Sequence, residues 1–319
     1  MKENKDSGLN STEKTVGNGV RTFFMDMLRG VPIGAAFIIP GFSGGSVAAI
    51  LGIYEKMIEA VATLLRNMWK SVIILLPIVI GMMLGVVSLL FPLGGALEAF
   101  PLPTVSLFVG LAIGGIPSVT DKIPGKPTRT NLVALIIPFL FAFALSFVPL
   151  GNDVDLFALD FGGYIVLMLV GMLGSIALIV PGISGSMLLL ILGYYNPVLK
   201  LATEHFFVGK DFWLCLLVLG VCGAGIVIGF ILISLIMKML LNKYQRGTYF
   251  AIVGFIIGSL PTVYISTMKD AGMLSASLEL VWLPTSPLYW IASIVLISIG
   301  FVAAYSLVRY TRRVSDKKS

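Results

Sequence analysis

The sequence predicts an all-α polytopic membrane protein with an inverted-topology repeat, in which each half contains one re-entrant broken hairpin and three transmembrane helices. Three observations predict this fold. The 319-residue chain is 57% hydrophobic and only 12% charged, with a mean hydropathy of +1.00. Its apolar runs are long enough to cross a bilayer, and two of them are broken by related Pro-Gly motifs. Since soluble domains carry about 25% charged residues, a soluble globular protein is excluded.

The elements follow from the apolar runs, because a helix needs about 20 apolar residues to cross a bilayer. Six runs are predicted to be ordinary spans: 71–91, 103–120, 131–150, 211–240, 248–266 and 285–308. The runs 30–53 and 162–195 are each interrupted near the middle. Residues 1–20 have no apolar core and predict a disordered cytoplasmic tail, and residues 311–319 predict a basic cytoplasmic tail.

An internal duplication relates residues 21–155 to residues 160–310. The segment PGFSGG at 40–45 aligns with PGISGS at 181–186, at an offset of 141 residues. Two further segments, 81–85 and 110–119, align with 225–229 and 254–263 at an offset of 144. Three matches in the same order predict two structurally related halves.

Basic residues decide between two arrangements of these halves. If the broken segments cross the membrane, there are eight spans and the halves are parallel. If they are re-entrant, each half has three spans and the second half is inverted. The re-entrant arrangement places 19 of the 22 Lys and Arg residues in the cytoplasm and leaves Lys200, Lys210 and Lys269 outside. This partition follows the positive-inside rule, so we predict the inverted arrangement with both termini cytoplasmic.

The broken tips are predicted to meet near the midplane and to bind an anion there. Proline ends a helix and glycine lets the backbone turn, so the predicted breaks are Pro40, Gly41, Pro181 and Gly182. A half-helix then starts at a serine N-cap, where free N–H groups and the positive end of the helix dipole attract an anion. The predicted binding residues are Ser43, Gly44, Gly45, Ser46, Ser184, Gly185 and Ser186, with Arg29 and Lys56 attracting a phosphate at the cytoplasmic mouth. One such motif also fits a simple kink, but its duplication in opposite orientations favours a site.

The residue types missing from the spans argue against several functions. Long stretches, including 71–91 and 212–237, contain no charged residue and no histidine, which disfavours a proton pump or a voltage-gated pore. The only histidine, His205, has too few neighbouring ligands for a metal, and it is not placed to activate the serines. No catalytic residue, metal or cofactor is therefore predicted. Cys215 and Cys222 would lie about 10 Å apart along one helix, too far for a disulfide.

Small residues form stripes on several predicted helices. They include Gly81 and Gly85, Gly110 and Gly114, Gly171, and Gly225 and Gly229. Such stripes predict close helix packing. A mobile seam along which a lipid tail slides is the alternative interpretation.

At the broken motifs the sequence resembles the PopT family of polyprenyl-phosphate transporters, formerly an unnamed bacterial membrane family. The segments PGFSGGS at 40–46 and LGIYE at 51–55 are similar to the family's PGVSGGT and LGIYE. The segment VPGISGS at 180–186 is similar to its ILPGISGS half, and the resemblance covers about residues 25–308. Phe37 stands where many members have Asp, so no role of that carboxylate is carried over.

The resemblance implies translocation of undecaprenyl phosphate, the lipid carrier of cell-wall synthesis, from the outer to the inner leaflet of the bacterial plasma membrane. The implied partners are a polyprenyl-phosphate lipid and the bilayer. The net charge of +6 lies in tails and short loops, which indicates a membrane surface and not nucleic acid. The sequence leaves open whether the protein forms a homo-oligomer. Two other functions also stay open: a transporter or channel for a small soluble anion, which needs a closed aqueous path, and an intramembrane lipid phosphatase or transferase. A lipid carrier instead needs a lateral opening between helices.

Overall fold

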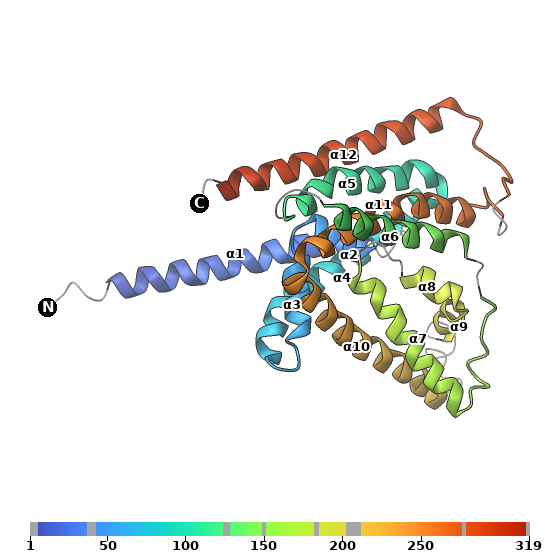
Figure 1. Cartoon of the computed structure of the whole chain (residues 1–319), viewed down its shortest axis with the longest axis horizontal. Coiled ribbons are helices and arrows are strands. Elements are labelled where there is room, and N and C mark those ends of the chain that lie inside the picture. Colours follow the sequence, from blue (N-terminus) through green and yellow to red (C-terminus); the bar gives the residue numbers. More distant parts are fainter. Residues whose placement is uncertain are drawn as a thin grey trace.

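The computed structural model describes residues 6–36, 43–123, 128–148, 151–181, 185–201, 212–275 and 279–316. The predicted site residues Pro40, Gly41, Gly182 and Ser184 lie outside these ranges, as does His205. The first half contains α1 (Asp6–Ala36), α2 (Gly44–Ile50), α3 (Tyr54–Ala62), α4 (Met68–Ala99), α5 (Pro101–Thr120), α6 (Arg129–Ala144) and the 3₁₀ helix η1 (Leu145–Phe147). The second contains α7 (Phe161–Ile179), α8 (Gly185–Ile191), α9 (Tyr195–Lys200), α10 (Phe212–Lys243), α11 (Gln245–Asp270) and α12 (Pro287–Asp316), all shown in Figure 1.

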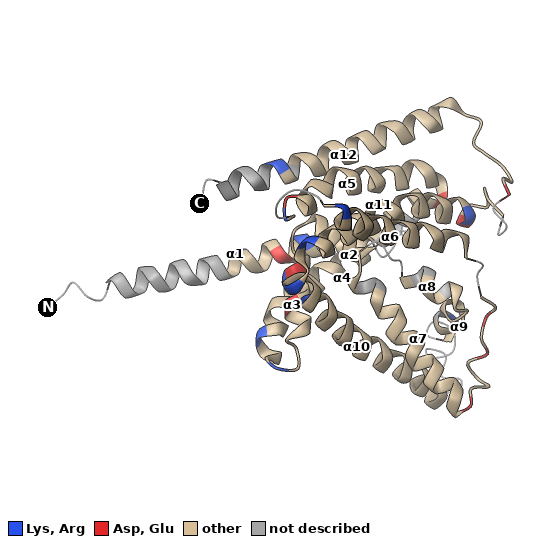
Figure 2. Ribbon diagram, viewed as in Figure 1, with Lys and Arg blue, Asp and Glu red and all other residues tan. Residues whose placement is uncertain are grey.

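Six segments in the described ranges are long and apolar enough to cross a membrane: Met68–Leu89, Pro101–Thr120, Arg129–Phe147, Phe212–Lys243, Gln245–Asp270 and Pro287–Ser306. They coincide with the six spans expected from the sequence, and the described residues contain no strand beyond one isolated bridge. The prediction of an all-α polytopic membrane protein is therefore confirmed. Charged residues gather toward the helix ends and in the connections (Figure 2).

Helix α1 begins at Asp6, inside the stretch 1–20 that the sequence suggests is a disordered tail. Composition alone does not separate these two states, because the polar residues there have no apolar face that would mark a helix. The apolar part of α1 supplies a formed helix from which further turns propagate at little cost.

The long helices make four main contacts, and each contact has an equivalent under the internal duplication. Helix α1 packs on α4 in the first half, and α7 packs on α10 in the second. The other pairs cross between the halves, since α5 packs on α12 and α6 packs on α11.

Glycine makes these helix contacts close. A β-carbon added at Gly81 would overlap the Met27 carbonyl oxygen, and one added at the equivalent Gly225 would overlap that of Met168. The close-packing interpretation of the glycine stripes is confirmed. The alternative of a lipid seam along them fails, because helix backbone already occupies that space.

The short helices α2 and α8 end in the same turn. Gly52 and Gly193 follow them with φ of 72° and 75°, a conformation that glycine adopts at no steric cost. The next N–H group closes the turn in each case, from Ile53 to the Ala48 carbonyl (3.1 Å) and from Tyr194 to the Leu189 carbonyl (2.9 Å). This is the Schellman termination of a helix, repeated in both halves.

Each broken segment finishes beside the place where it started. In the first half, Asp26 of α1 forms an ion pair with Lys56 of α3. In the second half, the Val154 N–H before α7 donates to the Gly193 carbonyl after α8 at 3.0 Å. The residues that flank each broken segment therefore lie next to each other.

The largest core cluster surrounds α2. Ala48 and Ala49 of α2 share this cluster with Ile179, Met237 and Ile252 of the second half. A second cluster contains Cys215 and Cys222, which are buried thiols and form no disulfide, as expected. The first broken segment is thus inserted between the two halves.

Candidate functional site

The first break presents two buried hydroxyl groups at the start of α2. Ser43 occupies the N-cap position with extended backbone (φ −106°, ψ 125°), as expected, but its side chain makes no capping hydrogen bond. Ser43 and Ser46 are 3% and 2% exposed, and their hydroxyl oxygens have no hydrogen-bond partner in the described structure. Leaving such a group unpaired costs about 1–3 kcal/mol. These hydroxyls therefore have hydrogen-bonding capacity left for a ligand.

The two breaks lie against each other. A β-carbon at Gly45 would lie 3.2 Å from the Ile179 carbonyl oxygen and 3.4 Å from the Pro181 Cα. Pro181 is buried, and Val180 before it has the extended backbone that a residue preceding proline prefers. On the far side of the second break, α8 begins with the half-buried Gly185 and continues with Ser186.

The start of α2 is chemically suited to an anion. The N–H groups of Gly44, Gly45 and Ser46 belong to the first turn, where no intrahelical carbonyl is available to accept from them. The two serine hydroxyls add side-chain donors, and the helix dipole places partial positive charge at the same point. The arrangement offers hydrogen-bond donors without a cationic side chain.

Arg29 and Lys56 lie together at the end of the bundle that carries α3, here called the α3 end. Both pair with Asp26, which is 2% exposed; the Arg29 Nη1 lies 3.6 Å from its Oδ1, and Lys56 contacts its Oδ2. Asp26 was not predicted as a site residue. Its position three residues before Arg29, on the same helix face, was the available signal.

Glu55 ties α3 to neighbouring elements at the same end. It accepts hydrogen bonds from the Lys122 ammonium (2.8 Å) and from the Tyr249 hydroxyl of α11. Burial acts to raise the pKa of the Glu55 carboxyl, but these hydrogen bonds and the Lys122 charge outweigh it, so the pKa lies below its ordinary value. Glu59 lies 3.6 Å from Lys238 of α10. Polar contacts thus connect α3 to α10, to α11 and to the segment after α5, around a small cavity of about 150 Å³ that Glu55, Glu59 and Tyr249 help to line.

A lateral apolar groove of about 470 Å³ opens between α7, α10 and α11. Its lining residues include Ile176, Val180, Pro181, Ile233, Ile236, Met237, Leu240, Tyr244, Gly247, Thr248, Ala251, Ile252 and Phe255. The Thr248 hydroxyl donates to the carbonyl of Tyr244, the residue before α11, at 3.0 Å, and no lining residue is charged. The groove reaches the second break at Pro181. The sequence suggested a lateral opening in general terms but did not place it.

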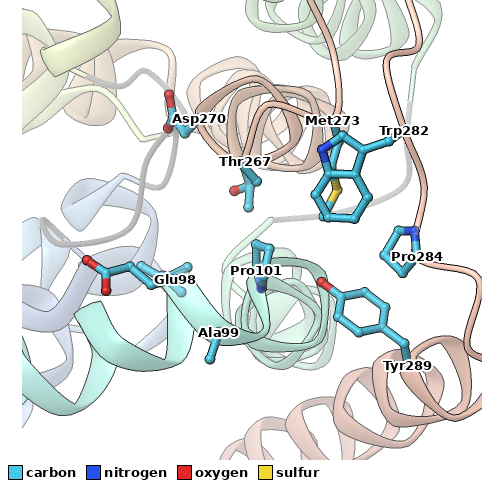
Figure 3. A pocket seen from close by; sticks show the side chains of 11 residues that line it. Glu98, Ala99, Pro101, Thr267, Asp270, Met273, Trp282, Pro284 and Tyr289 are labelled. Carbon is cyan, nitrogen blue, oxygen red and sulfur yellow. The ribbon is translucent and has the colours of Figure 1, made fainter.

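A second cavity, of about 460 Å³, lies at the opposite end of the bundle. Figure 3 shows Trp282, Pro284 and Tyr289 on one side of it and the carboxylates of Glu98 and Asp270 on the other. Two carboxylates repel a phosphate, so this cavity is unsuited to hold the headgroup. Sequence reasoning missed it, although Glu98 and Asp270 each stand near the end of an apolar helix.

Known proteins resemble the chain over most of its length. A family model described as VCA0040-like, undecaprenyl phosphate translocase-like, matches residues 33–281. The chain is 32% identical to a polyprenyl-phosphate transporter of Staphylococcus aureus, over 90% of this chain and 97% of that protein. It is 27% identical to a polyprenyl-phosphate transporter of Vibrio cholerae, over 90% of this chain and 96% of that protein. No solved structure matches. The chain therefore belongs to the undecaprenyl phosphate translocase-like family.

Proposed function

We propose that this protein translocates a polyprenyl phosphate, such as undecaprenyl phosphate, between the leaflets of a bacterial plasma membrane, with the phosphate held between the two breaks. The observation that carries the site is the pair of buried, unpartnered hydroxyls of Ser43 and Ser46, next to the point where Gly45 contacts the second break. Both curated relatives are named polyprenyl-phosphate transporter. The remaining members of the site are Gly44, Ser184, Gly185 and Ser186.

The physical task explains this design. The prenyl chain stays in hydrocarbon throughout, whereas the charged phosphate has to cross it at a cost of several kcal/mol or more. Donors at the midplane offset part of that cost. Because the donors are hydroxyl and backbone N–H groups, the phosphate is not trapped by a fixed opposite charge and is able to leave on the other side. Arg29 and Lys56 attract it at the mouth, where Asp26 keeps them in place.

The inverted repeat accounts for access from both leaflets. Two observations support it: the residues that flank each broken segment lie next to each other, and the helix pairs of one half recur in the other. The α3 end is then cytoplasmic, with both termini, and transport runs from the outer to the inner leaflet by alternating access.

Cysteine labelling tests the orientation. In a variant lacking Cys215 and Cys222, Gly125→Cys should react with an impermeant maleimide only after the cells are opened. Ala158→Cys, which is exposed at the opposite end, should react in intact cells. Labelling of residue 125 from outside would overturn the inverted arrangement.

Transport is tested in reconstituted vesicles, by following movement of a fluorescent polyprenyl phosphate between leaflets. Gly44→Leu and Gly185→Leu should abolish movement, because a bulky side chain blocks approach to the backbone donors. Gly223→Leu is the matched control, since a β-carbon there meets nothing within 4 Å. Full activity of the Gly44→Leu, Gly185→Leu double variant would move the site elsewhere.

The same vesicles separate the other two functions. Uptake of inorganic phosphate without lipid movement would show a soluble-anion transporter. Release of inorganic phosphate from the lipid would show an intramembrane phosphatase.

A further inference from the structure

We propose that the lateral groove between α7, α10 and α11 binds the isoprenoid chain of the lipid whose phosphate lies at the breaks. This inference rests on the proposed function and deepens it, because it assigns the second part of the substrate to a separate surface. Four features of the groove support it: its connection to the breaks, its opening to the outside of the bundle, its lining, and a helix contact that the first half makes at the equivalent place.

The inner end of the groove is part of the break. Val180 and Pro181 line the groove, and Pro181 is also the residue against which Gly45 packs. The floor residues Met237 and Ile252 belong to the core cluster that contains Ala48 and Ala49 of α2. If the phosphate of a lipid lies at the start of α2, the attached chain therefore begins at the inner end of this groove.

The groove also opens to the outside of the bundle. Ile236, one of its lining residues, is 47% exposed, whereas Met237 beside it is buried. The lining thus runs from the core to the membrane-facing surface. A long isoprenoid chain does not fit entirely within the groove. Its far end would therefore extend from the open side of the groove into the bilayer.

The lining selects the chemical class of the occupant. None of the lining residues is charged, the hydroxyl of Thr248 already donates to the Tyr244 carbonyl, and the other polar side-chain group of the lining is the Tyr244 hydroxyl. A hydrated anion would lose its water there and gain few partners. A hydrocarbon chain loses nothing, and the volume of about 470 Å³ is within the usual range of a ligand pocket.

The duplicated sequence shows that this opening is not a fixed property of the helix pair. By the offset of 144 residues, Met237, Leu240, Thr248 and Ile252 correspond to Leu93, Ala96, Thr104 and Phe108. Thr104 donates from α5 to the Ala96 carbonyl of α4 at 3.0 Å, and Leu93 and Phe108 pack around one common cluster. Thr104 also donates to the Phe100 carbonyl at 2.7 Å, which is the counterpart of the Thr248 bond to Tyr244; the bond to the neighbouring helix is the one that Thr248 does not make in the described structure. The groove is open in the second half where the equivalent contact is made in the first.

A substitution that fills the groove provides the first test. Ala251→Trp places an indole in the groove, and Ala303→Trp places one on the exposed face of α12. Movement of a C55 polyprenyl phosphate should fall at least about tenfold in Ala251→Trp, a loss of about 1.4 kcal/mol, and stay at the wild-type rate in Ala303→Trp. A C10 prenyl phosphate, whose short chain does not need the groove, should move equally well in all three proteins.

The outcomes are separable. Equal movement of the C55 lipid by Ala251→Trp and wild type would overturn the groove assignment while leaving the proposed function intact. Failure of the wild type to move either lipid would overturn the proposed function itself. Equal loss of C10 and C55 movement in Ala251→Trp would also overturn the assignment, because it would show damage to the phosphate path.

Photo-crosslinking provides a test that does not depend on transport. A benzoylphenylalanine at position 236 lines the groove, and one at position 235 stands next to it on α10, outside the lining; the native side chains are 47% and 45% exposed. In vesicles with a small fraction of C55 polyprenyl phosphate among phospholipids, intact-mass spectrometry should show prenyl-phosphate adducts at 236 and phospholipid adducts at 235. Phospholipid adducts alone at both positions would show an ordinary lipid in the groove and overturn the proposal.

Discussion

Replacing Ser43 or Ser46 by alanine should make the protein more stable and less active at the same time. Both hydroxyls are buried and unpartnered. An unsatisfied buried hydroxyl costs about 1–3 kcal/mol, so its removal should stabilise the ligand-free protein by about 1 kcal/mol after the small void left behind is counted. A gain of that size raises Tm by roughly 2–4 °C in domains of about 150–250 residues, and by less in a longer chain.

Transport should change in the opposite direction. A hydrogen bond to a charged group contributes about 1.5–3 kcal/mol, and the backbone N–H groups of Gly44 and Gly45 remain to compensate part of the loss. We therefore expect each single substitution to slow lipid movement by about tenfold, equivalent to about 1.4 kcal/mol, which is less than the loss expected for Gly44→Leu.

Ser106→Ala is the matched control. Ser106 is 1% exposed, but its hydroxyl donates to the Leu102 carbonyl (2.7 Å) and contacts the Tyr264 hydroxyl (2.8 Å). Its removal should lower Tm, because a buried partner is left unpaired. The assays are thermal unfolding in detergent and lipid movement in vesicles at equal protein amounts. If Ser43→Ala lowered Tm as Ser106→Ala does and left transport unchanged, the hydroxyl would be structural and the site assignment would be refuted.

Three further predictions concern the α3 end and the helix contacts. Lys56→Gln or Arg29→Gln should reduce transport a few-fold in the vesicle assay, since a cation near the membrane surface contributes about 1 kcal/mol; complete loss in a folded protein would move the phosphate site to the α3 end. The pKa of Glu55 is lowered from 4.5, so its contribution to stability should be complete above pH 4.5 and be lost as the pH falls through the folded-state pKa. Unfolding curves of wild type and Glu55→Gln should therefore converge at acidic pH, and parallel curves would contradict this. Gly225→Ala should lower Tm because its methyl group would overlap the Met168 carbonyl, whereas Gly223→Ala on the same helix meets nothing; equal Tm values would show that α7 and α10 separate freely.

Much of the architecture was predictable because it depends on local rules. The six spans follow from run length and composition, and the structure places six such segments in the same positions. The glycine stripes predict close packing since a missing side chain is visible in a sequence. The repeated turn after α2 and α8 was not predicted, although Leu-Gly at Gly52 and again at Gly193 is a local signal of it.

Other features depend on residues far apart in the chain. The pairing of Asp26 with Lys56 joins positions 30 residues apart, and that of Glu55 with Tyr249 joins positions 194 residues apart. The Ser43 side chain fits the N-cap role in the sequence but makes no capping bond in the structure. A single sequence shows which donors exist, but not which of them are already bonded.

The sequence by itself determined an all-α membrane protein with two related halves and two broken segments, because hydropathy, proline and glycine act within a few residues of where they stand. Only the tertiary structure decided that α5 packs on α12 and α6 on α11, that Gly45 meets Pro181, and that the groove at α7, α10 and α11 is open. The physical reason is that the hydrophobic effect is non-directional, so the composition of an apolar helix face does not specify which other apolar face it packs against. The partner of each face is instead determined by shape and chain connectivity across the whole molecule.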